Sequence, residues 1–499
     1  MALNVLSLFL GLSIIFLTTS SLAQKIENDS LSVSVGTGAN ISSNNFLPFY
    51  LVHNQWGMVN EKSNIFTTIK LNYEYLVKSD WLLKVGLRSR NSILATYYFQ
   101  TTYKSIDFIL GAEPKIIGGL DTDLKINHFG LSSNALPLPM IKFRLNKFVP
   151  VAKTRNYIWI KGELSHGYFE SNRYMSNARL HHKNLYLKFK LEKLIGFNLT
   201  TGFLHFAQYK GSKPFGLQKA NKPNSFWDVF MIREQNYEFD SQTIEENGNG
   251  NHLGMTEIII DRHFNEHHLS LNYQVPFENK EDIKLINIKD FLVSLNWKLP
   301  QKNEFVKELQ IEYSQIKFQD GAGLQQPTKN YPTVYNNSKF GGRNDYYNHW
   351  LYRSGFTYHN KVLGNPLIST YQWTQNFIPS YQTYGFPVIN NRINSIHAAV
   401  SGQLSKKIAY SLFLTSTLNF GTYTGLFEGL DNWEGTIDDP FFDYPFKGGK
   451  WQHYSYLSVE IKDINNFPIL ITTKLAFDFG DLYTNSGLEL CLSYIVKTP

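Results

Sequence analysis

The sequence predicts an all-β fold, a transmembrane antiparallel β-barrel whose strands carry one apolar and one polar face. Apolar side chains recur at every second position along most of the chain, and successive side chains of a strand point to opposite faces. Many of these runs are about ten residues long, whereas strands of globular proteins average about 5–6 residues. Aromatic residues stand near many run ends, as in the interfacial girdles of membrane barrels: Tyr75, Trp81, Trp297, Phe420, Trp451 and Tyr494.

The last run of the chain shows the alternation best. Leu488, Leu490 and Leu492 fall on one face, and polar residues such as Glu489 and Ser493 on the other. Corresponding runs lie at 69–75, 83–87, 185–191, 269–275, 309–313, 408–420 and 469–479. A soluble β-sandwich would turn the apolar faces inward, whereas a membrane barrel turns them toward lipid and encloses the polar faces. The length of the runs and their terminal aromatics favour the barrel.

Composition excludes several other classes of protein. Of the 499 residues, 15% are aromatic and only 18% are charged, so the chain buries too much apolar surface to be disordered. The single cysteine, Cys491, excludes an intramolecular disulfide scaffold. A net charge of +7 without a basic run argues against a nucleic-acid partner. Only the N-terminus has a long apolar run, so a polytopic helical membrane protein is not expected.

Residues 1–23 are predicted to be a secretory signal peptide, which leaves 24–499 for the barrel. The apolar run Val5–Leu17 is short for a membrane span, and Ser21 and Ala23 place small residues at the −3 and −1 positions of a cleavage site. The alternative is an N-terminal membrane anchor. Gln24, and not a cysteine, would follow the cut, so a lipoprotein is not expected. The chain is therefore predicted to be exported.

Stretches without alternation are predicted to be loops or insertions. They lie near 112–150, near 209–262 with a short helix at 225–232, at 318–349 and at 421–450. The last stretch combines Trp433 and Tyr444 with acidic residues that include Asp438 and Asp439. Aromatic rings stack on sugar faces while carboxylates accept hydrogen bonds from hydroxyls, so these four residues are candidates for carbohydrate binding. The alternative is an ordinary barrel loop whose aromatics pack on one another.

Motifs of catalysis or metal binding are weak in this chain. Residues 263–267 match the H-x-x-E-H spelling of a zinc protease motif, which requires a helix. Here they precede an alternating strand, which predicts a turn. His181 and His182 are adjacent on a predicted strand and point to opposite faces, so they are not expected to bind one metal. A phosphate-binding G-x-x-x-x-G-K-[ST] loop and a G-x-S-x-G elbow are both missing. We therefore expect no enzyme, no cofactor and no metal.

Several stretches taken together resemble the capsule assembly Wzi family in the form found in Bacteroidetes-type bacteria. The resemblance depends on their order and spacing from about 42 to 393, because each stretch alone is unspecific. The stretches are 42–51, 54–57, 134–139, 161–167, 180–186, 205–208, 250–254, 350–359, 364–367 and 391–393. Leu136 stands where that family form usually has Arg.

The resemblance implies an outer-membrane β-barrel of about 18 strands with short helical or loop insertions. It also implies a lectin-like, non-catalytic protein that binds capsular polysaccharide at the cell surface, with outer-membrane lipid as its other partner. Arg353 lies within a family stretch and is a candidate for pairing with an acidic sugar; a salt bridge across a polar lumen is the alternative. A porin-like channel for small solutes or glycan fragments is the alternative function. The sequence predicts no oligomeric state.

Overall fold

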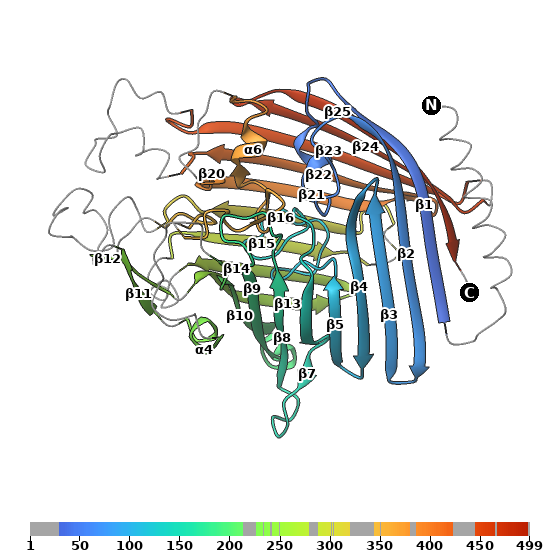
Figure 1. The fold of residues 1–499 in the computed structure, drawn as a ribbon. Coiled ribbons are helices and arrows are strands. Elements are labelled where there is room, and N and C mark those ends of the chain that lie inside the picture. Colours follow the sequence, from blue (N-terminus) through green and yellow to red (C-terminus); the bar gives the residue numbers. More distant parts are fainter. Residues whose placement is uncertain are drawn as a thin grey trace.

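The computed structural model contains a closed antiparallel β-barrel of 18 strands (Figure 1). It describes residues 29–212, 226–232, 234–239, 242–248, 250–278, 288–300, 302, 304–319, 344–349, 351–379, 386–422, 445–464 and 467–497. Strand β1 pairs with β2 on one side and with β25 on the other, which closes the barrel. The predicted fold class is confirmed.

In the barrel wall, each strand pairs antiparallel with the wall strand that precedes it and the one that follows it in sequence. Its strands are β1 (Asp29–Ser42), β2 (Asn64–Lys78), β3 (Trp81–Arg90), β4 (Ile93–Tyr103), β5 (Ile106–Ala112), β6 (Met140–Leu145), β8 (Ile158–Tyr168), β9 (Arg179–Phe189), β10 (Asn198–Tyr209), β13 (Asn251–Phe264), β14 (His267–Phe277), β15 (Phe291–Lys298), β16 (Glu308–Gln315), β21 (Ile393–Ser405), β22 (Ile408–Asn419), β23 (Lys450–Lys462), β24 (Ile469–Gly480) and β25 (Asn485–Lys497).

The remaining elements are short. They are β7 (Val149–Pro150), β11 (Glu234–Phe239), β12 (Gln242–Gly248), β17 (Thr357–Tyr358), β18 (Lys361–Val362), β19 (Ser369–Thr370), β20 (Val388–Asn390) and the helices α2 (Phe49–Val52), α3 (Glu192–Ile195), α4 (Phe226–Phe230) and α6 (Tyr371–Thr374). Strand β7 pairs with the first part of β8, and β6 pairs with the part of β8 that follows. Within the described residues no helix has the length and apolarity needed to cross a membrane.

The alternation expected from the sequence sets the two faces of the wall. On β25, Leu490 and Leu492 are half exposed on the outside, whereas Glu489 and Ser493 are buried inside. On β22, Leu414 faces outward while Thr415 and Thr417 face inward and are buried. A sandwich would have buried the leucines instead. The outer face is therefore apolar, as lipid requires.

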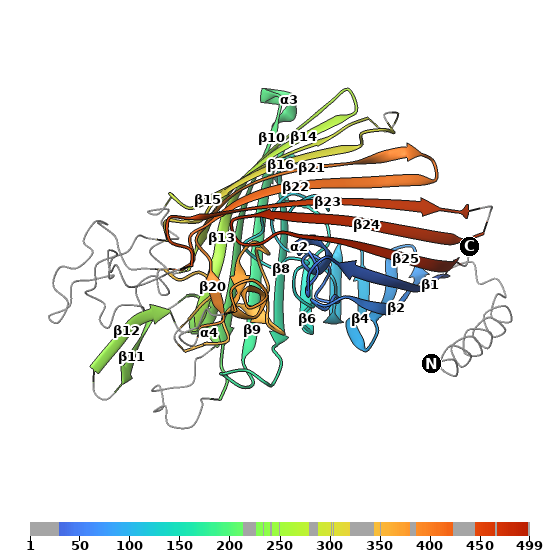
Figure 2. The ribbon, with the colours of Figure 1, turned by 90° about the horizontal axis from the view of Figure 1, so that it is seen from above.

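Aromatic side chains stand on the outer face near both ends of the wall. Trp81 and Trp297 lie at strand ends on the side of the barrel where the first and last strands have their free ends, which we call the terminal end. Trp451 lies at the opposite, distal end. These three predicted girdle positions are exposed on the outside. The C-terminus of β25 and the elements α4, β11 and β12 mark opposite ends of the barrel (Figure 2).

Connections at the two ends differ in length. At the terminal end none exceeds twelve residues, and 79–80, 104–105, 265–266 and 406–407 are two-residue turns. The distal end carries the long connections 43–63, 113–139, 210–250, 316–392 and 420–449. Two expected insertions are narrower than the sequence indicated: 112–150 contains the wall strand β6, and 209–262 contains most of β13. The prolines of the first region and the polar run of the second obscured the alternation of these strands. The short helix expected at 225–232 is present as α4.

Candidate functional site

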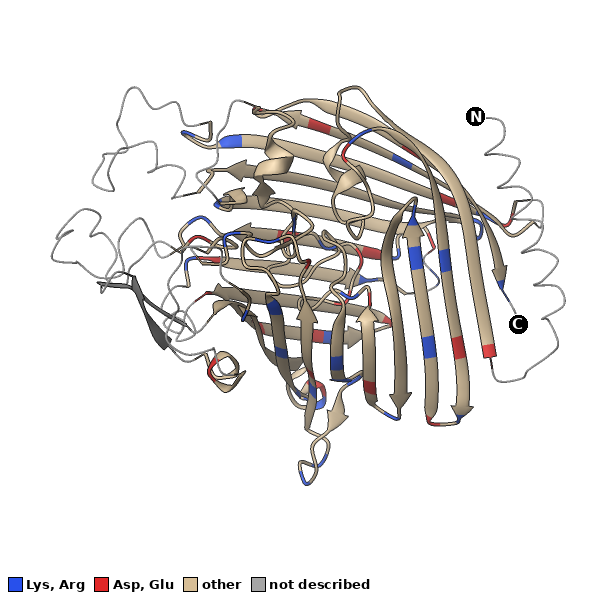
Figure 3. Ribbon diagram, viewed as in Figure 1, with Lys and Arg blue, Asp and Glu red and all other residues tan. Residues whose placement is uncertain are grey.

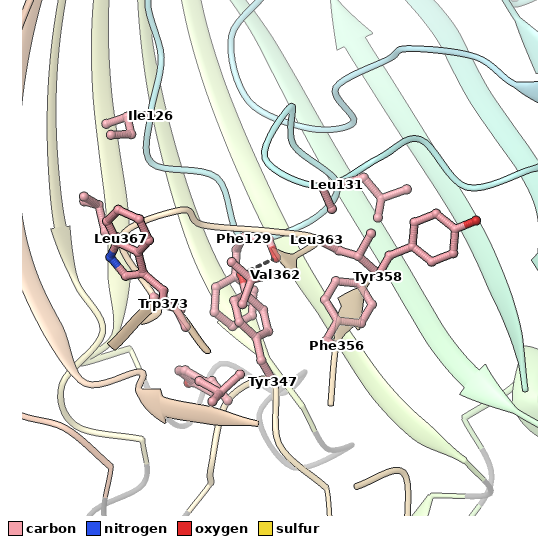
Figure 4. Close-up of a cluster of buried hydrophobic side chains, with 14 of the residues drawn as sticks. Ile126, Phe129, Leu131, Tyr347, Phe356, Tyr358, Val362, Leu363, Leu367 and Trp373 are labelled. Atoms are coloured by element: carbon pink, nitrogen blue, oxygen red, sulfur yellow. Dashed lines mark hydrogen bonds between the residues drawn. The ribbon is translucent and has the colours of Figure 1, made fainter. Parts of the chain in front are cut away.

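The lumen of the barrel is filled by three distal connections that fold back into it. We call them plug segments: the first at 43–63, the second at 113–139, and the third within 344–392. Their apolar side chains form one core with inward wall residues such as Leu204, Met255 and Tyr454. Figure 4 shows this core, with residues of the second and third segments in contact.

Aromatic rings join the second and third plug segments. Phe129 packs against Tyr346 and Tyr347, with ring centroids 5.0 and 5.2 Å away. The Tyr347 hydroxyl donates to the Phe129 carbonyl over 2.7 Å and accepts from the Asn365 backbone N–H over 3.1 Å. Gly364 lies beside this contact, where a Cβ would overlap Tyr347 Oη and the Phe129 carbonyl. The chain needs glycine there because of this close approach.

Acidic side chains of the wall and its margins hold backbone amides of the plug. Asp478 accepts from Phe49 N over 2.6 Å, and Glu257 accepts from Gly119 N over 2.7 Å. Glu312 accepts from two successive amides of the second segment, and Glu278 accepts from Tyr347 N over 3.1 Å. A buried acidic side chain, or a buried backbone N–H, that has no hydrogen-bond partner is costly. These contacts fix each plug segment to the wall.

Polar contacts also join the first and third plug segments. Lys361 donates to the carbonyls of Val52 and Val59, over 3.4 and 3.2 Å. Burial, together with the Lys361 charge, lowers the pKa of His53 to about 3. The imidazole of His53 is therefore neutral, and its Nδ1 lies 2.7 Å from Asn134 Oδ1 of the second segment, to which it donates. The three segments thus behave as one packed body.

The remaining inward charges of the wall are mostly paired with one another. Arg90 and Lys474 share Glu489, at 2.8 and 2.9 Å. A few strands along the wall, Arg144 of β6 bridges Asp107 of β5 and Glu113 at the start of the second plug segment, at 2.7 and 2.8 Å. Figure 3 shows Lys and Arg positions interspersed with Asp and Glu positions along the strands. Pairing of this kind stabilises charges inside a barrel that is shielded from bulk water.

A cleft remains between the second plug segment and the terminal end of β6–β14, with a volume of about 330 Å³. It is lined by basic residues from the wall and the plug, and by carboxylates and imidazoles near the β13–β14 turn. Lys161 and Lys188 stand over the ring of Phe148, 5.7 and 6.0 Å from its centroid.

At the distal end, Arg353 is exposed and its guanidinium lies 5.1 Å from the ring centroid of Tyr174. The Ser354 hydroxyl accepts from the Tyr174 backbone N–H over 2.9 Å. Next to it, Arg173 donates to the carbonyls of Gly355 and Thr357. These bonds lock the 169–178 connection to the third plug segment and hold the Arg353–Tyr174 pair at the mouth of the barrel.

The structure brings one predicted site residue, Arg353, together with an aromatic ring. Trp433, Asp438, Asp439 and Tyr444 lie outside the described residues; they belong to the connection between β22 and β23, which leaves the wall at the distal end. Tyr174 was missed because it stands in a short connection that carries no motif. The two histidines at 181–182 do face opposite ways: His182 bonds Ser165 inside, and His181 contacts Phe226 of α4 outside.

The fold and its filled interior define a plugged β-barrel of the outer-membrane type. The chain is similar to Wzi of Escherichia coli, an outer-membrane protein involved in group 1 capsule assembly and described as a carbohydrate-binding β-barrel. The two share 10% identity over 92% of this chain and 83% of Wzi, with a TM-score of 0.53. Two Pseudomonas aeruginosa proteins, OccK5 and the outer membrane protein OprD, each share 8% identity over 95% of this chain and 99% and 96% of theirs, with TM-scores of 0.44 and 0.43. No protein-family model and no curated protein sequence matches the chain. At 10% identity, the likeness to Wzi shows the fold alone.

Proposed function

We propose that this protein is an outer-membrane β-barrel that binds and retains capsular polysaccharide at the cell surface, without catalysis. The observation that carries the proposal is the lumen filled by three plug segments, each held by carboxylates. A filled lumen suits a surface-binding barrel better than a channel. The similarity of the fold to a carbohydrate-binding barrel supports the same conclusion.

The lengths of the connections give the orientation. Outer-membrane barrels have short periplasmic turns and longer extracellular loops, so the distal end faces the outside of the cell. This orientation exposes Arg353, Tyr174 and the 420–449 connection to polymer. A guanidinium matches a sugar carboxylate in a bidentate way, and a tyrosine ring packs against the apolar face of a sugar. We therefore include Arg353 and Tyr174 in the binding site, and retain Trp433, Tyr444, Asp438 and Asp439 as further candidates.

A porin-like channel is the second candidate, and the 330 Å³ cleft at the terminal end is the observation that favours it. That cleft is bounded by residues 115–121 of the second plug segment, however. A solute would have to displace this segment, which Glu257 holds at Gly119. Conductance in planar bilayers separates the candidates, because a plugged barrel passes little current and a channel passes steady current.

The test of retention is the distribution of polysaccharide between cells and medium in a strain that lacks the protein. We expect polymer to be made in normal amounts and shed into the medium, and the wild-type gene to restore retention. Arg353→Ala should restore it only in part, because the guanidinium is lost while the fold remains. Polymer that stays on cells in normal amounts without the protein would contradict the proposal.

Lys193→Ala is the matched control for Arg353→Ala. Lys193 is also an exposed cation in a connection, but it lies in α3 at the terminal end, which faces the periplasm in the proposed orientation. Its loss should leave retention unchanged. Equal effects of the two substitutions would mean that general surface charge, and not the distal mouth, governs retention.

A further inference from the structure

The β13–β14 hairpin brings two imidazoles and a carboxylate together on the inner face of the wall. His263 and His268 are directly opposite each other in the pairing of the two strands. Asp261 is two residues before His263, and therefore points to the same face. The ligand atoms of these three side chains all lie within 4.8 Å of one another, which no other group of His, Cys, Asp or Glu among the described residues achieves.

The hairpin holds the two imidazoles in fixed register. Its turn consists of Asn265 and Glu266, both with positive φ (45° and 67°), as a two-residue type I′ turn requires. The rings of His263 and His268 lie parallel, with centroids 4.1 Å apart and an interplanar angle of 3°. Because register and turn are set by the backbone, little conformational entropy would be lost when both rings bind one ion.

Neighbouring strands orient the carboxylate. Asp261 Oδ1 accepts from Lys188 Nζ over 2.8 Å, and Oδ2 accepts from Asn198 Nδ2 over 2.9 Å. Asp261 Oδ2 lies 4.0 Å from His263 Nε2. Hydrogen-bonded carboxylates of this kind are typical of metal sites, where outer partners orient the ligands. Lys188 also offsets the negative charge of Asp261.

We propose that Asp261, His263 and His268 form a binding site for a divalent transition-metal ion, with Zn²⁺ as the ion that fits best. Two imidazoles and one carboxylate suit zinc and its neighbours, and disfavour Ca²⁺ and Mg²⁺, which take oxygen ligands. Tetrahedral zinc with bonds of 2.0–2.1 Å needs ligand atoms about 3.3 Å apart. To bind it, the two stacked imidazoles must turn out of parallel so that their in-plane lone pairs converge on the ion.

The site has an open side. The side chain of His263 is 59% exposed, and all three residues line the 330 Å³ cleft at the terminal end. Three protein ligands leave the fourth position of a tetrahedral ion to water or to an anion in the cleft. In the orientation proposed above, the ion would enter from the periplasm. The metal site itself does not depend on the proposed function.

The test is calorimetric titration of ZnCl₂ into the untagged full-length barrel in detergent, after chelator treatment. We expect the wild-type protein to bind one zinc ion that His263→Gln and His268→Gln bind at least about tenfold more weakly. Co²⁺ in place of zinc should give a tetrahedral absorption spectrum that both substitutions abolish. The His263 side chain is largely exposed, so His263→Gln should fold; a gel shift on boiling checks this for each variant.

His267→Ala is the matched control. His267 belongs to the same hairpin but faces outward, where its Nδ1 accepts from the Trp297 indole N–H over 3.1 Å. Its loss should leave zinc affinity unchanged. The proposal is overturned if the wild-type protein binds no stoichiometric zinc, if His263→Gln leaves affinity unchanged, or if His267→Ala weakens binding as much as His263→Gln does.

Discussion

The two hydrogen bonds between Glu312 and the second plug segment allow a quantitative prediction. Glu312 is 1% exposed, and its Oε2 accepts from the backbone N–H groups of Ile126 and Asn127 over 3.0 and 2.7 Å. Its Oε1 accepts from Gln310. Glu312→Ala removes the acceptor of both amides. An orphaned buried donor costs about 1–3 kcal/mol, so undocking of the segment becomes easier by about 2–6 kcal/mol.

Hydrogen exchange followed by mass spectrometry measures this undocking directly. Since about 1.4 kcal/mol corresponds to a factor of ten, even the lower bound of 2 kcal/mol predicts exchange about 30-fold faster in peptides that contain Ile126 and Asn127. Conductance in planar bilayers should show transient openings that the wild-type protein lacks. Strands of the wall should keep their protection, because the barrel itself is not changed.

Glu308→Ala provides the control on the same strand. Near the terminal end, Glu308 pairs with Lys298 at 3.8 Å and accepts from Asn296 over 2.8 Å, both on the neighbouring strand β15 and not on the plug. Its loss should therefore change the free energy of undocking by less than about 1 kcal/mol. If these peptides exchange at a rate within threefold of the wild type in Glu312→Ala, the hydrogen bonds to carboxylates do not hold the plug. Apolar packing alone would then hold it.

Two further substitutions test the wall and the plug core. Leu412→Arg places a charge on the outer face near the middle of β22 and should lower the free energy of unfolding in lipid vesicles by about 2–4 kcal/mol, measured against Leu412→Ala; equal stability of the two would mean that this face does not contact lipid. Gly364→Ala forces a methyl group against Tyr347 and Phe129 and should destabilise the docked plug by about 1–3 kcal/mol, seen as faster proteolysis within 113–139; unchanged proteolysis would contradict the packing described.

The wall could be predicted from the sequence because its signal is local. Each strand needs only its own alternation to show which side chains face lipid, so Leu490 and Glu489 were assigned to the correct faces. Strand β6 was not predicted, because it has only six residues and lies between proline-containing segments. The number of strands came from the resemblance to a family, since alternation alone gives no count.

The plug could not be predicted, because its contacts join residues far apart in the chain. Phe129 meets Tyr347 across 218 positions, and no periodicity marks either segment. The metal ligands show the same limit on a smaller scale. The H-x-x-E-H run was correctly assigned to a turn, but the partner of His263 is His268, which becomes visible only when the hairpin register is known. The distal Arg353–Tyr174 contact likewise joins two connections.

The first and last parts of the chain are linked by the β1–β25 pairing, and also by contacts of the first plug segment. The first plug segment leaves β1 and is held at once by the last hairpin: Asn485 Nδ2 donates to the Phe46 carbonyl over 2.7 Å, and Asp478 binds Phe49 N. Closing a loop of more than 400 residues has an entropic cost that local pairing elsewhere in the wall does not carry. The interior can therefore be sealed only after the β24–β25 hairpin has paired. Chains in which the C-terminal hairpin has not yet paired keep both an open edge and a loose first segment, which exposes them to edge-to-edge aggregation.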